Sequence, residues 1–201
     1  MTRLFVCKLL IIVAGACAGF LVIYGRKTTN PHGFATVANR PFPWEYERSG
    51  GEDVAYVRFL RCLPLKLRGT KVQYYTGGDV RFQSLKYAVV DIPFLSNAEQ
   101  CSDVCMGLKA EYLYHAGLYG RICFQNVNGK MQNYRGGLSK ISFERYLRNP
   151  YSVASTYSPS REMKAGRLAD MEPGDVFVYL AWYGQKYGHA MMVDVAVNKR
   201  S

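Results

Sequence analysis

The chain has 201 residues, of which 49% are hydrophobic and 20% charged, a composition that excludes a disordered polypeptide and suits one domain with its own core. The formal net charge is +11, but the basic residues form no dense run and no recognisable nucleic-acid-binding module. We therefore expect no nucleic-acid partner, and we interpret the charge as an aid to solubility and to attraction by an anionic envelope surface.

Residues 1–27 are expected to be a signal peptide or an uncleaved membrane anchor. The stretch 4–24 is apolar apart from Lys8, and basic residues flank it on both sides. Both alternatives predict a protein of the periplasm or cell envelope, either secreted or held at the membrane by this segment. Residues 28–53, which are rich in proline and glycine, are expected to form a linker to the domain.

Residues 54–201 are expected to fold as a single α+β domain. The spacing of apolar residues and the turn signals predict strands at 54–60, 71–75 and 86–92, a helix from about residue 96 to Gly117 or Gly120, a strand at 121–127, a short helix at 142–147 that Pro150 stops, and strands at 176–180 and 189–197. This order favours a helix packed on an antiparallel sheet.

The central helix carries two cysteines one turn apart. Ser96 and Glu99 match the S-x-x-E capping box, which places the start of the helix ahead of Cys101. Cys101 and Cys105 then lie on the apolar face of the helix, a pattern typical of buried core thiols. Four cysteines follow the export segment and could form two disulfides, although Cys101 and Cys105 are poor partners for each other on one helix.

Cys101 and His189 are the candidate catalytic pair. A cysteine hydrolase needs a thiolate close to an imidazole that lowers the thiol pKa and later returns the proton, and a helix N-terminus favours the charged sulfur. The helix with Cys101 comes first, a strand opened by Gly174 and Asp175 follows, and Gly188 and His189 open the next strand. This order is similar to that of papain-like envelope hydrolases, including the NlpC/P60 and CHAP groups, and the similarity implies a papain-like fold.

Two other interpretations of these residues stay open. In the first, Cys101 and His189 are core residues of a non-catalytic envelope or binding module. In the second, Cys101, Cys105 and His189 bind a metal ion, but the sequence contains no C-x-x-C pair of the kind that structural zinc sites use. We therefore predict neither a metal site nor a cofactor.

Three stretches of the sequence resemble a bacterial family of exported proteins, domain of unknown function 4846, which is common in Bacteroidetes. The stretches are EQCSDVCMGLKAEYLY from Glu99, FERYL from Phe143 with ASTYSPSREM from Ala154, and PGDVFVYL from Pro173 with YGHAMMVDVAVN from Tyr187. The resemblance covers about residues 71–199. Residue by residue it carries over Gln100, Cys101, Asp103, Thr156, Gly188, His189 and Ala190.

The resemblance also implies a further strand and a glutamine-rich segment after the strand of His189. The sequence ends at Ser201, so we expect the domain at 54–201 to be shortened at its C-terminus.

The site hypothesis names Cys101 as nucleophile and His189 as base, with three substrate-binding residues: Gln100, Thr156 and Gly188. The substrate would be an amide bond of a cell-wall or other peptide, by analogy with the fold alone.

Overall fold

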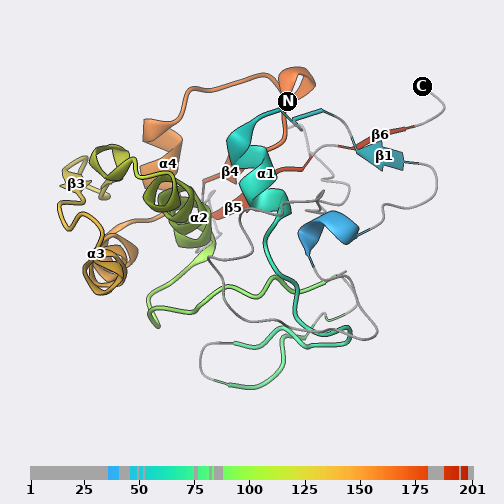
Figure 1. Ribbon diagram of the computed structural model, residues 1–201, viewed down its shortest axis with the longest axis horizontal. Coiled ribbons are helices and arrows are strands. Elements are labelled where there is room, and N and C mark those ends of the chain that lie inside the picture. The colour runs from blue at the N-terminus through green and yellow to red at the C-terminus, as the bar shows by residue number, and fades with distance from the viewer. Residues whose placement is uncertain are drawn as a thin grey trace.

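The computed structural model describes residues 36–40, 46–48, 50–51, 53–74, 77–81, 83, 88–180, 188–194 and 196–198. These residues combine helices with small antiparallel sheets, which confirms the α+β class (Figure 1). The expected export segment, residues 1–27, lies outside the described ranges. No helix within them is both long and apolar enough to cross a membrane.

Most elements in the described ranges are short, and α2 and α3 are the longest helices among them. In chain order the elements are η1 (Val37–Asn39), β1 (Tyr46–Arg48), α1 (Ala55–Arg61), α2 (Cys101–His115), η3 (Tyr119–Arg121), β2 (Cys123–Gln125), β3 (Met131–Asn133), α3 (Lys140–Val153), α4 (Tyr157–Glu162), η4 (Leu168–Asp170), β4 (Val176–Tyr179), β5 (His189–Met192) and β6 (Ala196–Asn198). The strands pair antiparallel, β1 with β6, β2 with β3, and β4 with β5.

Residues 54–60, predicted as a strand, form helix α1 instead. Val57, Phe59 and Arg61 are all buried at alternate positions, which is the pattern that suggested a strand. Leu60 is buried as well, which a strand with one buried face does not explain. Burial of consecutive residues fits a helix that other elements cover on several sides. The rings of Phe59 and of Tyr112 on α2 lie 5.8 Å apart, so packing on the central helix decides the conformation.

Two further expected strands contribute only isolated bridges. In the range 71–75, Gln73 bridges to Asp79, and in the range 86–92, Val90 bridges to Leu65. Residues 71–74 are exposed, and in the second range Val90 and Ile92 pack against the core without extending the bridge into a ladder. For these residues the prediction of full strands is wrong.

Helix α3 is longer than predicted at both ends. Ser139, rather than Ser142, caps it, because the Ser139 hydroxyl accepts the N–H of Ser142 at 3.3 Å. Pro150 was expected to stop the helix, but it lies in the last turn and the helix continues to Val153. Proline removes one hydrogen bond there, and the burial of Pro150 beside Leu147 compensates for it.

Helix α2 lies between two apolar clusters that form the core of the described part of the chain. One cluster joins α1 and the Cys105 side of α2 to the hairpin of β4 and β5. The other cluster joins α2 to α3 and β2. Figure 1 shows α2 between α3 on one side and α1, β4 and β5 on the other. The helix that carries Cys101 is therefore the central element of the fold.

Part of the expected linker at 28–53 packs on the domain. Val37 is fully buried, and its N–H donates to the Leu63 carbonyl at 2.8 Å. Strand β1 pairs with β6 near the other end of the chain. The strand expected at 189–197 is divided, because Asp194 leaves the ladder of β5 and pairs with a buried arginine of α1 before β6 begins.

Candidate functional site

Helix α2 begins at Cys101, later than the sequence predicted. The hydroxyl of Ser96 accepts the N–H of Ala98 at 3.1 Å, and the carboxylate of Glu99 accepts the N–H of Leu95 at 3.1 Å. These bonds close a turn ahead of the helix, so the capping box predicted at Ser96 and Glu99 is wrong. Serine and acidic side chains bond to nearby backbone in turns as readily as at helix caps, which is why the pattern was misleading.

Gln100 is the cap position of α2, and the side chain of Asp103 closes the cap. The N–H of Gln100 donates to the Asp103 carboxylate at 2.8 Å. The N–H groups of Cys101 and Ser102 have no acceptor among the described residues, as is usual in a first helical turn. The Cys101 thiol therefore lies beside free N–H groups, at the positive end of the dipole of a 15-residue helix.

The two cysteines of α2 differ in their surroundings. Cys105 lies in the core, and burial raises the pKa of its thiol to about 12, which makes it an unreactive packing residue. Cys101 is only half-buried. Both are free thiols, as is Cys123, so the pair of disulfides that four cysteines could form is not present.

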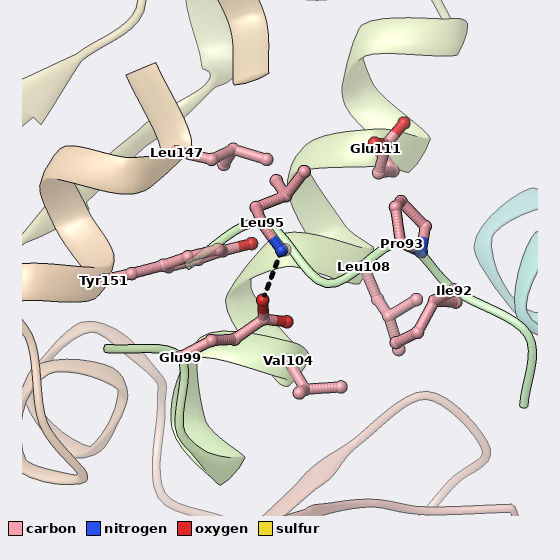
Figure 2. Close-up of a pocket in the computed structure, with 10 residues that line it drawn as sticks. Ile92, Pro93, Leu95, Glu99, Val104, Leu108, Glu111, Leu147 and Tyr151 are labelled. Carbon is pink, nitrogen blue, oxygen red and sulfur yellow. Dashed lines mark hydrogen bonds between the residues drawn. The ribbon is translucent and has the colours of Figure 1, made fainter. Parts of the chain in front are cut away.

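A small cavity lies beside the first turns of α2 (Figure 2). Its volume of about 30 Å³ can hold one or two water molecules and is far too small for a substrate. Figure 2 shows Tyr151 reaching across from α3 towards Glu99, which bonds to Leu95. Burial raises the pKa of the Glu99 carboxyl and raises the pKa of nearby Asp103 to about 7. We interpret this cavity as a hydrated part of the fold.

His189 opens strand β5 and faces away from α2. Its ring packs edge-on against the ring of Tyr179, with centroids 5.9 Å apart, and burial lowers the pKa of the imidazole. Side chains alternate along a strand, and the next residue, Ala190, lies in the same apolar cluster as Cys105 of α2. His189 therefore projects from the opposite face of the hairpin, and no hydrogen bond joins it to Cys101.

The remaining predicted site residues fall into separate regions. Gln100 is exposed beside Cys101 at the start of α2, and Gly188 directly precedes His189. Thr156 is buried ahead of α4, a helix that packs against β2. Gln100 lies beside Cys101, and Gly188 beside His189, only because each pair is consecutive in the chain. No hydrogen bond in the described ranges joins Thr156 to either pair.

The described residues contain no group of three or more histidine, cysteine, aspartate or glutamate side chains placed to hold a metal ion. The ionic cluster on α2 is instead centred on Glu111, which pairs with Lys140 at 2.7 Å and with His115 at 3.2 Å. Burial alone would raise the pKa of Glu111, but the hydrogen bonds from His115 and Lys140 outweigh it and hold the pKa below its usual value. This cluster fixes α3 to α2.

A much larger cleft lies between the loop at 160–171 and strand β4. Its volume of about 630 Å³ is in the range of ligand-binding sites in proteins. Its lining is partly apolar, with Phe177 on the strand and Met163 and Leu168 on the loop. Charged side chains of both signs, among them Lys164 and Asp175, complete the lining.

Strand β4 turns an unpaired edge towards this cleft. At its start the N–H of Gly174 donates to the Val193 carbonyl and the N–H of Val193 donates to the Asp175 carbonyl, each at 2.8 Å, so two residues oppose one in a β-bulge. Bonded and non-bonded pairs alternate in an antiparallel ladder, so the backbone groups of Val176 and Val178 point away from β5. No strand in the described ranges pairs with this edge.

Sequence reasoning missed this cleft. The loop at 160–171 carried no predicted element, yet Met163 and Leu168 interrupt its polar sequence, which is a weak sign of a binding surface. From the sequence, Gly174 and Asp175 indicate the start of a strand and do not indicate a cleft. Gly174 has φ +93°, a conformation that glycine adopts readily in bulges and turns, and it lies at the start of β4 among the residues that line the cleft.

Comparison with known proteins places the chain in one family. No curated protein and no solved structure matches it. The model of the family described as Domain of unknown function (4846) matches residues 37–138, which is 102 of the 201 residues and extends from η1 through α1 and α2 to β3. The match includes Cys101 and ends before the cleft and His189. The chain therefore belongs to the domain of unknown function 4846 family.

Proposed function

We propose that this protein is a peptide-binding module of the bacterial cell envelope, which binds an extended peptide along strand β4. The observation that carries the proposal is the unpaired edge of β4 beside a cleft of about 630 Å³. An extended peptide has the same backbone N–H and C=O groups as a strand and can satisfy that edge. The envelope location rests on the export-like pattern of residues 1–27.

The bound peptide would add a third strand to the hairpin of β4 and β5. Val176 and Val178 offer two outward N–H and two outward C=O groups, which match a peptide segment of about four residues at roughly 3.3 Å per residue. These main-chain bonds supply affinity. Alternate side chains of the peptide would enter the apolar part of the cleft between Phe177 and Leu168, which supplies selectivity.

The placement of the predicted catalytic pair favours binding over catalysis. Cys101 lies on α2, which packs on the face of the hairpin that carries Ala190. His189 projects from the other face, where its ring contacts Tyr179. A thiol and an imidazole must be within hydrogen-bond reach to exchange a proton, and this arrangement separates them by the hairpin.

A randomised pool of acetylated and amidated hexapeptides tests the proposal. The full chain is incubated with the pool, complexes are isolated by size exclusion, and retained peptides are identified by mass spectrometry. Val178→Pro should retain at least tenfold less peptide than the wild type, because proline removes an outward N–H and leaves the bonds to β5 intact. Val178→Ala is the matched control, since it shortens the same side chain but keeps that N–H.

Equal retention by Val178→Pro and the wild type, or no retention by either, would overturn the proposal. Circular dichroism confirms that the proline variant is folded. Hydrogen exchange gives a second test that needs no variant. The amides of Val176 and Val178 should exchange at least tenfold more slowly with a retained peptide bound, whereas the amide of Phe177, which is bonded to β5, should change little.

A second candidate function is a cysteine hydrolase of papain-like fold. It is favoured by the start of α2 at Cys101, which places a half-buried thiol among free N–H groups. The Cys101 thiolate would attack an amide carbonyl carbon, protonated His189 would give its proton to the leaving amine, and water would then release the acyl group from sulfur. This reaction needs a Cys101–His189 hydrogen bond, which the described arrangement lacks. We therefore prefer the peptide-binding module to the hydrolase as the proposed function.

Thiol labelling with iodoacetamide distinguishes the two functions. A hydrolase predicts that Cys101 reacts at pH 6 at least tenfold faster than Cys123, the other half-buried free thiol, and that His189→Ala slows the reaction. A binding module predicts similar rates for Cys101 and Cys123 and no effect of His189→Ala. Cys105 should remain unlabelled in the folded protein in either case, because it is buried.

A further inference from the structure

We propose that the loop and helix start at 136–141, here called the tip, dock onto an anionic lipid bilayer by inserting two aliphatic side chains. Leu138 is 81% exposed and Ile141 is 73% exposed, the two highest values for large hydrophobic side chains in the described part of the chain. Single exposed aliphatic residues are common on protein surfaces, but two neighbours at this level call for a physical cause. The proposal is independent of the peptide cleft.

The exposure of Leu138 is not the result of a loosely held loop. The buried side chain of Tyr114 donates its hydroxyl to the Leu138 carbonyl at 2.5 Å, and the hydroxyl of Tyr134 lies 2.8 Å from the Gly137 carbonyl. The residue before a helix cap often packs back onto the fourth helical residue, which here is Phe143. Phe143 is fully buried without Leu138, so the backbone holds Leu138 outward.

The charges around the tip complement anionic lipid head groups. Residues 126–150 contain five basic residues and one acidic residue, a net charge of +4. Arg135 and Arg145 are exposed and form no ion pair with any described residue, and Arg145 lies one helical turn after Ile141. Lys140 points inward to Glu111 at 2.7 Å, so it does not interrupt the apolar pair.

The position of the tip suits contact with a planar surface. Figure 1 places α3 and β3 at one end of the molecule and the β1–β6 pair at the other. An aliphatic tip flanked in the sequence by Arg135 and Arg145 has the composition of proteins that insert shallowly at a bilayer interface, where apolar burial and attraction to anionic lipids add. Because the tip backbone is already fixed, docking would cost little ordering entropy.

Tryptophan quenching by brominated lipids tests the proposal on the full chain. The variant Ile141→Trp is mixed with vesicles of brominated phosphatidylglycerol, and its emission is compared with that of the parent protein. The matched control is Leu67→Trp, because Leu67 is 58% exposed and also lies between basic residues, Lys66 and Arg68. We expect at least twofold stronger quenching for Ile141→Trp than for Leu67→Trp. Both variants share every other segment of the chain, so the difference between them reports only the two substituted positions.

The charge contribution has its own measurement. Adding Arg135→Gln and Arg145→Gln to Ile141→Trp should weaken insertion of the tip roughly thirtyfold, since each basic residue near an anionic surface strengthens association about fivefold. The readout is the fall in quenching by brominated phosphatidylglycerol to the level of Leu67→Trp, because residues 1–27 could hold the whole chain on the vesicle in either case. Thermal unfolding confirms that these surface variants are folded. Equal quenching at positions 141 and 67 would overturn the proposal. Equal quenching of Ile141→Trp by brominated phosphatidylcholine would also overturn it, because the site would then not select anionic lipid.

Discussion

Replacing Asp194 with alanine should lower the free energy of unfolding by about 3–5 kcal/mol, as loss of one partner of a buried ion pair does. The Asp194 carboxylate lies 2.6 Å from Nη2 of Arg61 and 3.1 Å from Nε of Arg48. The side chains of Asp194 and Arg61 are only 4% and 1% exposed. In the variant the Arg61 guanidinium would still bond to the Gly50 carbonyl, at 2.9 Å, but it would lose the Asp194 carboxylate while its charge stays buried.

Urea unfolding followed by circular dichroism measures this loss. Asp91→Ala is the control, because Asp91 pairs with Lys66 at 3.7 Å on the surface and should cost less than about 1 kcal/mol. A change in Asp194→Ala as small as in the control would contradict the prediction. The double variant Arg61→Met with Asp194→Leu should recover most of the loss, because apolar residues of similar volume can replace a buried pair.

The central helix and the last hairpin could be predicted because their signals are local. The apolar stripe through Cys101 and Cys105 and the turn residues around Gly174 need no information from the rest of the chain. Helix α1 could not be predicted in this way. Val57 and Phe59 alternate as in a strand, and only their contact with α2, which begins some 40 residues later, makes the helical form the better packed one.

The candidate site illustrates the same limit. The chain order of Cys101 and His189 could be read from the sequence, but the face on which each side chain lies could not. That face is set by which residues of β5 meet α2, and Ala190 takes the inward position there. The open edge of β4 was equally hidden, because an edge is defined by the absence of a neighbouring strand, which no local pattern encodes.

Replacing Gly107 with alanine should destabilise the protein by about 1–3 kcal/mol, although the same change in most helix interiors is stabilising. A Cβ added at position 107 would lie 2.3 Å from the hydroxyl oxygen of Tyr151. Tyr151 is 4% exposed and packs in the cluster between α2 and α3, so displacing its rigid ring would disturb that packing. Figure 2 shows Tyr151 reaching from α3 towards the α2 helix. Urea unfolding gives the change in stability.

A second background makes the steric explanation testable. Tyr151→Phe removes the hydroxyl, and the nearest remaining ring atom, Cζ, would lie 3.4 Å from the new Cβ, an ordinary contact. In that background Gly107→Ala should stabilise the protein by up to about 1 kcal/mol through helix propensity. Gly120→Ala is the control, since nothing lies within 4 Å of its new Cβ. If Gly107→Ala destabilises both backgrounds equally, the Tyr151 hydroxyl is not what requires glycine. If Gly107→Ala destabilises the parent protein but stabilises the Tyr151→Phe variant, then the close approach of α3 is the reason that α2, the helix with Cys101, requires glycine at position 107.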